Sequence, residues 1–237
     1  MDREISIPTG AGKSIRISSD MRINQSFLPI SDSVLIMKAA EVLGVNDAGQ
    51  SPKEGTALFY PAAGRDLITP ILLGVPFCTE FYFYECSAGP FRSAKAIEKA
   101  LAKIFGNVDF ESGNSCRYIY TFIYEDQQRR VNWLRGKNSD FLELDVNLAM
   151  YFHRGDSYGE GGSGECWDST LFNFLKSKAR SGLLRVVTQG EPGGLGEDLV
   201  NTLQTIQVNS ESTMHRDGKY YIGVYSASKE QPTILKF

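Results

Sequence analysis

The chain has 237 residues, of which 42% are hydrophobic and 22% charged, and its formal net charge is −3. These proportions are average for a soluble globular protein, and a chain of this length can bury enough surface to fold without disulfides or metals. Its basic residues are scattered rather than gathered into a stripe, which does not favour nucleic acid as a partner.

The sequence gives little indication of a membrane-spanning helix or of a secretory signal. The longest apolar stretch, 68–86, is interrupted by two prolines, a glycine and two glutamates. It therefore falls short of the roughly 20 apolar residues that a membrane helix needs. The first residues lack the apolar segment of a secretory signal, and four cysteines without Cys-x-x-Cys spacing indicate reduced thiols. We expect a cytoplasmic protein with no membrane segment.

The expected elements mostly alternate between strand and helix. Residues 1–30 contain short alternating runs, which predict edge strands or an N-terminal arm before a single domain over 31–237. The predicted strands are Thr56–Tyr60, Thr79–Cys86, Arg117–Tyr124, Arg129–Leu134, Asn147–Phe152, Leu183–Thr188, Thr213–Arg216 and Lys219–Ser226. The predicted helices are Ser31–Leu43, Leu67–Leu73, Phe91–Phe105, Asp168–Ala179 and Leu195–Ile206. Asp32 or Ser33 is placed to cap the first of these helices.

This order predicts an α/β fold with a Rossmann-like, doubly wound and mostly parallel sheet, and with helices on both faces. Residues 117–134 predict a β-hairpin around Glu125–Gln128 that is added to this plan. The dipeptide Asp217-Gly218, between two strand-like runs, predicts an antiparallel hairpin near the C-terminus.

A ligand site is expected at the carboxyl ends of the strands, where strand order reverses in open α/β sheets. The strand Thr56–Tyr60 delivers a loop with small residues to that edge, so that a ligand can approach the backbone. Glu85 ends the next predicted strand, 21 residues after Gly64. An acidic side chain about 20 residues beyond a glycine loop can accept hydrogen bonds from ribose hydroxyls.

In layout, residues 56–226 resemble the class I S-adenosylmethionine-dependent methyltransferase superfamily. The resemblance implies a seven-stranded, mostly parallel sheet with a reversed strand near the C-terminus. It also implies S-adenosylmethionine as the cofactor, held by Tyr60, Pro61, Ala62, Gly64, Asp66 and Glu85. The loop departs from the family pattern [DE]xGxGxG because it keeps one glycine, and no [DN]PP[YFW] motif is present.

The resemblance places His153 and Asp156 after the fourth strand, where many members keep substrate and catalytic groups. The ordinary pKa range of histidine suits a general base. The glycine-rich run that follows predicts either a mobile surface loop or a loop that contacts a substrate or partner. If the loop contacts a substrate or partner, the contacting residues are expected to be Glu160, Gly161, Gly162, Ser163 and Glu165. With two histidines and no HxxxH spacing, no metal site is predicted.

Two functions stay open at this point. One is an S-adenosylmethionine-dependent methyltransferase-like protein of unknown acceptor, in which catalysis depends mainly on positioning. The other is a non-catalytic Rossmann-like protein of the immunity, antitoxin-like or regulatory kind, whose acidic residues over 140–168 bind a protein partner. A nicotinamide-dependent oxidoreductase is disfavoured, because no GxGxxG follows the first predicted strand of the sheet. Fold by itself does not decide between the first two functions.

Overall fold

The structure is a computed structural model. It describes residues 4–10, 13–18, 32–45, 52–61, 63–113, 117–136, 138–141, 143–154, 169–180, 182–189, 201–207 and 219–226. The strands of the main sheet are β3 (Thr56–Tyr60), β4 (Glu80–Glu85), β5 (Val108–Gly113), β6 (Arg117–Tyr124), β7 (Gln127–Arg135), β8 (Asn147–His153), β9 (Leu183–Gln189), β10 (Leu203–Gln207) and β11 (Lys219–Ser226). The helices are α1 (Ser33–Val42), α2 (Ile68–Gly74), α3 (Ala94–Phe105), α4 (Asn138–Phe141) and α5 (Ser169–Lys178). Two further strands, β1 (Glu4–Gly10) and β2 (Lys13–Ser18), pair with each other in a separate small sheet.

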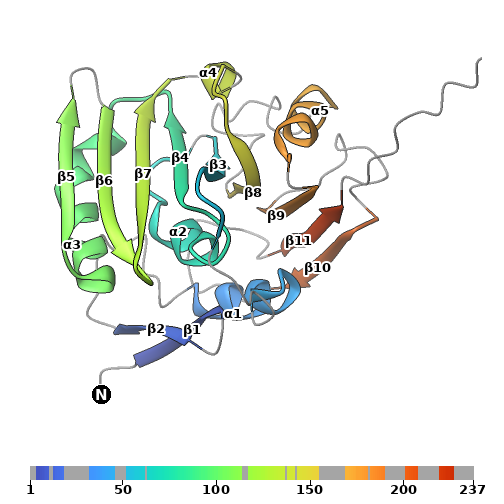
Figure 1. Ribbon diagram of the computed structural model, residues 1–237, viewed down its shortest axis with the longest axis horizontal. Coiled ribbons are helices and arrows are strands. Elements are labelled where there is room, and N and C mark those ends of the chain that lie inside the picture. The colour runs from blue at the N-terminus through green and yellow to red at the C-terminus, as the bar shows by residue number, and fades with distance from the viewer. Residues whose placement is uncertain are drawn as a thin grey trace, which may run out of the picture.

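The main sheet has the order β10-β11-β9-β8-β3-β4-β7-β6-β5 (Figure 1). Its five central strands, β9-β8-β3-β4-β7, run parallel to one another. From β3 the chain moves outward through β4 to β7 and then returns to the other side of β3 with β8 and β9. This is a doubly wound order, and it reverses between β3 and β8. The predicted Rossmann-like α/β fold is confirmed.

Antiparallel strands extend both edges of this parallel centre. The predicted hairpin at 117–134 is formed by β6 and β7, whose turn residues Glu125 and Asp126 both have positive φ, as a two-residue type I′ turn requires. Its second strand, β7, joins the parallel centre beside β4, whereas β6 and β5 lie outside it. At the other edge β11 runs antiparallel between β9 and β10, which is the reversed strand that the resemblance implies.

The prediction of a helix over 195–206 is wrong in its last residues, because 203–207 form strand β10. Leu203 and Ile206 have a helical spacing, but the five residues pair with β11 from Leu203↔Gly223 onward. Pairing with a neighbouring strand overrides a weak local pattern. The predicted strand 213–216 and the Asp217-Gly218 turn lie outside the described residues. Strand β5 was not predicted.

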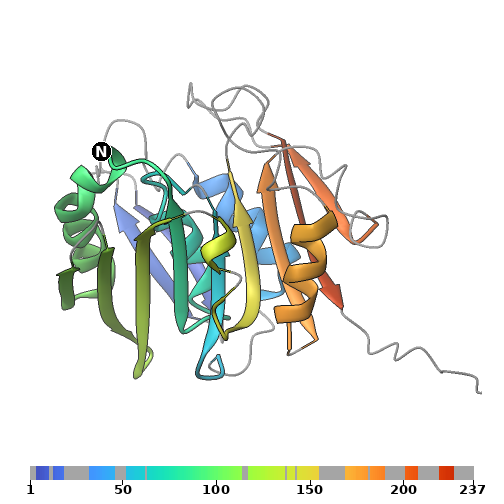
Figure 2. The same ribbon diagram turned by 90° about the horizontal axis from the view of Figure 1, so that it is seen from above.

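Each central strand buries side chains on both faces of the sheet, as strands of parallel sheets do. In β3, Leu58 and Tyr60 belong to one core cluster, with α1, α2, α3, β1 and β2, while Ala57 and Phe59 belong to a second cluster with α4 and α5. Figure 2 shows α5 on one side of the sheet and α1 with the small sheet on the other. None of the helices among the described residues is long and apolar enough to cross a membrane.

Helix α2 approaches the sheet closely at Gly74. A Cβ atom added there would lie 2.8 Å from Cε1 of Phe81 and 2.9 Å from Cδ1 of Leu58, and both side chains are fully buried. We expect Gly74→Ala to lower the free energy of unfolding by about 1–3 kcal/mol, as overpacking of a core does. Urea unfolding measures this loss. Gly89→Ala is the control, because Gly89 has helical φ and no neighbour within 4 Å; an equal loss in both variants would contradict the close approach.

Candidate functional site

The loop after β3 turns sharply at the carboxyl edge of the sheet. Asp66 N donates a hydrogen bond to the carbonyl oxygen of Ala63 at 2.9 Å, and Gly64 within that turn has a φ of +56°. Glycine suits this position because it adopts positive φ without a steric cost. A Cβ atom at Gly64 would meet nothing within 4 Å, so the space next to the turn is open.

Glu85, at the end of β4, is bonded to that loop. Its Oε2 accepts a hydrogen bond from Gly64 N at 3.0 Å, and its Oε1 accepts one from Ser87 N at 2.7 Å. Ala63 N also donates to the carbonyl oxygen of Tyr84 at 2.9 Å, so two hydrogen bonds join the ends of β3 and β4. Oε1 of Glu85 also accepts a hydrogen bond from Cys86 Sγ at 3.6 Å, whereas Oε2 has one partner, so the buried carboxylate keeps an unused lone pair on Oε2.

A buried ion cluster lies at the same edge, where strand order reverses. Arg154, directly after β8, donates to both oxygens of Asp66 at 2.8 and 2.5 Å and to Oδ1 of Asp32 at 2.7 Å. Asp32 precedes α1, and its other oxygen accepts the hydroxyl hydrogen of Thr69 at 2.5 Å. The side chains of Arg154, Asp66 and Asp32 are 3%, 7% and 20% exposed. The cluster therefore joins three segments that are distant in sequence.

Tyr60, the last residue of β3, completes this cluster. Its hydroxyl lies 2.9 Å from the carbonyl oxygen of Arg154 and 3.2 Å from Oδ2 of Asp66, and it can donate to either. Burial, reinforced by the Asp66 carboxylate, raises the pKa of Tyr60 well above its ordinary value, so the hydroxyl stays a neutral donor. Burial would lower the pKa of Arg154, but the carboxylates of Asp66 and Asp32 outweigh it and raise that pKa. The guanidinium is therefore charged at every accessible pH.

His153 ends β8 beside the cluster, and its ring meets the Tyr60 ring edge-on at a centroid distance of 6.4 Å. Burial lowers the pKa of His153 to about 4, against the effect of a backbone hydrogen bond at Gln189. The imidazole is therefore neutral at pH 7 and a weak base. Its assignment as a catalytic residue stays a prediction.

The structure brings together four of the residues expected to hold the cofactor, namely Tyr60, Gly64, Asp66 and Glu85, with Pro61 buried in the same loop. The expected cofactor residue Ala62 lies outside the described residues. The same is true of Asp156, Glu160, Gly161, Gly162, Ser163 and Glu165. No group of three metal-ligating side chains occurs in the part of the chain that the structure describes. Cys78 is buried and Cys86 exposed, and both are free thiols.

Two residues of the ion cluster were missed by sequence reasoning. Arg154 was assigned no functional role, and Asp32 or Ser33 was expected to cap α1. Asp32 does stand at the N-cap position, but its side chain makes no capping hydrogen bond, because its carboxylate bonds Arg154 and Thr69 instead. The contact between Asp32 and Arg154 spans 122 positions, and no local pattern marks such a pair.

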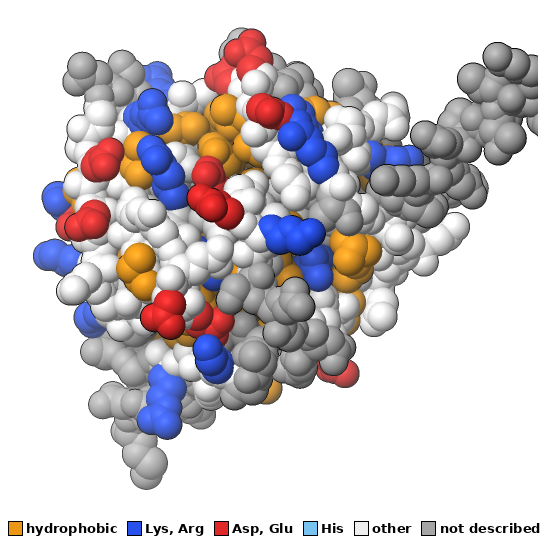
Figure 3. Space-filling view, in the orientation of Figure 1, with side chains coloured by type: hydrophobic (Ala, Val, Ile, Leu, Met, Phe, Trp, Pro, Cys, Tyr) orange, Lys and Arg blue, Asp and Glu red, His pale blue; other side chains and the backbone are white. Residues whose placement is uncertain are grey.

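The expectation of a protein partner rests on the acidic residues over 140–168, and only some of them lie among the described residues. Asp140, Glu143 and Asp145 are exposed, and Asp145 bonds Arg180. The face of the molecule in Figure 3 shows acidic and basic side chains interspersed, with hydrophobic ones between them. This face therefore does not present a single-sign field to a charged partner.

No protein-family model and no curated protein sequence matches the chain. Similar solved structures include M. capricolum TrmK in complex with S-adenosylhomocysteine, at 12% identity over 81% of this chain and 68% of that chain, with a TM-score of 0.42. Another is a precorrin-6y C5,15-methyltransferase from Geobacter metallireducens, at 9% identity over 81% and 89% of the two chains, with a TM-score of 0.44. A third is the human methyltransferase 10 domain containing protein, at 11% identity over 85% and 84%, with a TM-score of 0.42.

With TM-scores below 0.5, these likenesses do not carry the fold assignment, which rests on strand order and direction. Five parallel strands stand in doubly wound order, and β11 is reversed beside the fifth of them. The fold is therefore Rossmann-like, with the layout of a class I S-adenosylmethionine-dependent methyltransferase.

Proposed function

We propose that the chain binds S-adenosylmethionine at the carboxyl edge of β3 and β4 and is a methyltransferase-like protein. The observation that carries the proposal is the contact between the Glu85 carboxylate and the backbone of the Gly64 turn. In doubly wound sheets a ligand lies beyond this edge, and the acidic residue after the second strand accepts ribose hydroxyls. The hydrogen bond from Gly64 N holds the Glu85 carboxylate, an acidic residue at that position, beside the turn at Gly64, where the space is open.

Each residue has a distinct part in this proposal. The unused lone pair on Oε2 of Glu85 accepts a ribose hydroxyl, and Gly64, which has no side chain, lets the ligand approach the backbone. We assign Asp66 no direct contact with the ligand, because Arg154 bonds both of its oxygens and the Tyr60 hydroxyl lies 3.2 Å from one of them. It holds the loop in place instead.

When bound, S-adenosylmethionine supplies a methyl group activated by its sulfonium, so the main task of the protein is to align an acceptor. We place the acceptor beyond β8, near His153 and Asp156, with the residues 160–165 beside it. His153 is buried and neutral, so we assign it to positioning its surroundings rather than to proton transfer.

Thermal unfolding with S-adenosylmethionine or S-adenosylhomocysteine tests the proposal. A ligand at 100 times its Kd adds about 2.7 kcal/mol to the stability, which at this chain length raises the Tm by about 5–11 °C. Absence of a shift at millimolar concentrations of both ligands would reject the cofactor site.

A matched pair of glycine variants locates the site. Gly64 and Gly55 follow and precede β3, and both have positive φ and no neighbour within 4 Å of an added Cβ. Gly64→Leu and Gly55→Leu should therefore each lose about 1–2 kcal/mol from the strained backbone alone. We expect the ligand-induced rise in Tm to disappear in Gly64→Leu and to persist in Gly55→Leu. A rise that persists in Gly64→Leu would place the ligand elsewhere.

A further inference from the structure

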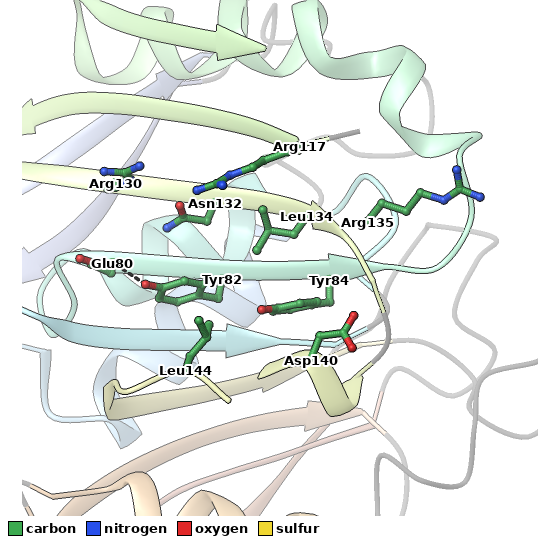
Figure 4. Close-up of a pocket in the computed structure, with 10 residues that line it drawn as sticks. All are labelled: Glu80, Tyr82, Tyr84, Arg117, Arg130, Asn132, Leu134, Arg135, Asp140 and Leu144. Carbon is green, nitrogen blue, oxygen red and sulfur yellow. Dashed lines mark hydrogen bonds between the residues drawn. The ribbon is translucent and has the colours of Figure 1, made fainter. Parts of the chain in front are cut away.

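A recess of about 620 Å³ lies on one face of the sheet, over β4 and β7 (Figure 4). This volume is in the range of small-molecule sites. Six of the side chains that line it carry the argument below, namely Glu80, Tyr82, Tyr84, Arg117, Arg130 and Asn132. None of these side chains takes part in the contacts of the Gly64 turn or of the ion cluster.

Among the described residues, the helices cover this face of the sheet only in part. Helix α5 and the short α4 cover β3, β8 and β9, and α4, at four residues, is the one described helix between β7 and β8. The opposite face of β7 is covered, since Trp133 packs against Phe91 with ring centroids 4.5 Å apart. Successive side chains of a strand point to opposite faces of the sheet, so Asn132, next to Trp133 in β7, points to the face of the recess.

The floor of the recess contains a buried hydrogen-bond donor that the protein does not use. Asn132 is 5% exposed, and its Nδ2 has no hydrogen-bond partner. Nearly all buried polar groups of folded proteins have a partner. Because Asn132 lines the recess, a bound molecule with an acceptor atom can supply the missing partner.

Basic side chains outnumber acidic ones by one in the lining of the recess, which contains Arg117, Arg130 and Arg135 with Glu80 and Asp140. Arg117 and Arg130 are exposed, and among the described residues neither forms an ion pair. Glu80 stands in register with Arg130, but its carboxylate accepts the Tyr82 hydroxyl hydrogen at 2.5 Å. Figure 4 shows Arg117, Asn132 and Tyr82 extending over the same part of this face. Guanidinium and amide donors together suit the several oxygens of a phosphate group.

Tyr82, which is partly buried, supplies the aromatic part of the site, and Tyr84, 4% exposed and packed edge-on against Phe59 and Phe141, forms the wall next to it. Both tyrosines extend from β4 on the same side, and Figure 4 shows them one after the other along the strand. Tyr82 stands in register with Asn132 on the neighbouring strand β7. Flat rings stack on tyrosine with little dependence on their identity. A ring stacked on Tyr82 and a phosphate against the arginines can therefore be held at once.

We propose that this recess binds a nucleoside monophosphate, with its phosphate on Arg117, Arg130 and Asn132 and its base stacked on Tyr82, next to the wall formed by Tyr84. The site is separate from the proposed cofactor site at the strand ends. Its occupation requires no residue of the Gly64 turn.

Isothermal titration calorimetry with uridine 5′-monophosphate tests the proposal, with uridine and inorganic phosphate as separate probes. We expect the nucleotide to bind at least tenfold more tightly than either probe, because only the nucleotide engages both halves of the recess. Equal affinity for inorganic phosphate, or no binding of the nucleotide at millimolar concentration, would overturn the proposal. So would loss of nucleotide binding in Gly64→Leu, which would place the nucleotide at the strand ends.

Variants distinguish the recess from general attraction to positive charge. Arg130→Met should weaken nucleotide binding at least tenfold, and Arg92→Met, which removes an exposed arginine outside the recess, should leave it unchanged. Asn132→Leu keeps the volume and removes the unused donor. We expect it to weaken nucleotide binding at least tenfold while the Tm of the free protein stays the same or rises, which a merely structural asparagine would not allow. Equal weakening by Arg92→Met, or unchanged binding by Asn132→Leu, would overturn the assignment.

Discussion

Replacement of Arg154 by methionine is expected to lower the free energy of unfolding by about 3–5 kcal/mol, the usual effect of removing one partner from a buried ion pair. The change leaves the Asp66 and Asp32 carboxylates together without a counter-ion, and Asp66 is only 7% exposed. It also removes the links between the loop after β3, the end of β8 and the start of α1. Urea unfolding at pH 7 measures the loss.

Two further variants show whether charge is the cause. Arg180→Met removes the partner of Asp145 in a surface pair whose side chains are 52% and 83% exposed, and it should leave the unfolding curve almost unchanged. Adding Asp66→Asn and Asp32→Asn to Arg154→Met should restore most of the stability, because no uncompensated charge is then buried. If this triple variant is as unstable as Arg154→Met alone, the loss comes from packing and the electrostatic explanation is wrong.

Acidification from pH 6.5 to about 4 is expected to destabilise the protein by about 3 kcal/mol through His153 alone. Burial lowers the pKa of His153 to about 4 in the folded protein, whereas the unfolded chain has the ordinary value of 6.5. Between these values the unfolded state binds a proton that the folded state does not. The free energy of unfolding therefore falls as the pH falls, and the contribution is fully lost below about pH 4.

The comparison of wild type with His153→Phe isolates this effect, because the other histidine, His215, is present in both proteins. Phenylalanine keeps a ring beside Tyr60 and cannot be protonated. Urea unfolding at several pH values from 7 to 5 covers the range above the ordinary pKa values of carboxylates. We expect wild type to lose stability over this range and the variant to lose much less. Parallel curves would show that His153 does not bind its proton differently in the two states.

Most of the parallel centre could be predicted from the sequence. Thr56–Tyr60 coincides with β3, and the predicted bounds of β4, β8 and β9 are correct to within one residue at each end. Strands buried on both faces must be continuously apolar, and this requirement is written into each short segment by itself. The contact of Gly64 with Glu85 was also within reach, because both belong to one strand–helix–strand unit and lie 21 positions apart.

Tertiary contacts alone decided the remaining features. Residues 203–207 became a strand because β11 offers them a partner, and β7 joined the parallel centre because β4 had a free edge. Asp66 and Asp32 meet Arg154 across 88 and 122 positions, so a residue expected to hold the cofactor and an expected helix cap belong to one ion cluster. The recess over β4 lies where the described helices do not cover one face of the sheet. Local sequence determines which segments are apolar enough to be buried, whereas long-range packing determines which polar groups meet and which surfaces stay uncovered.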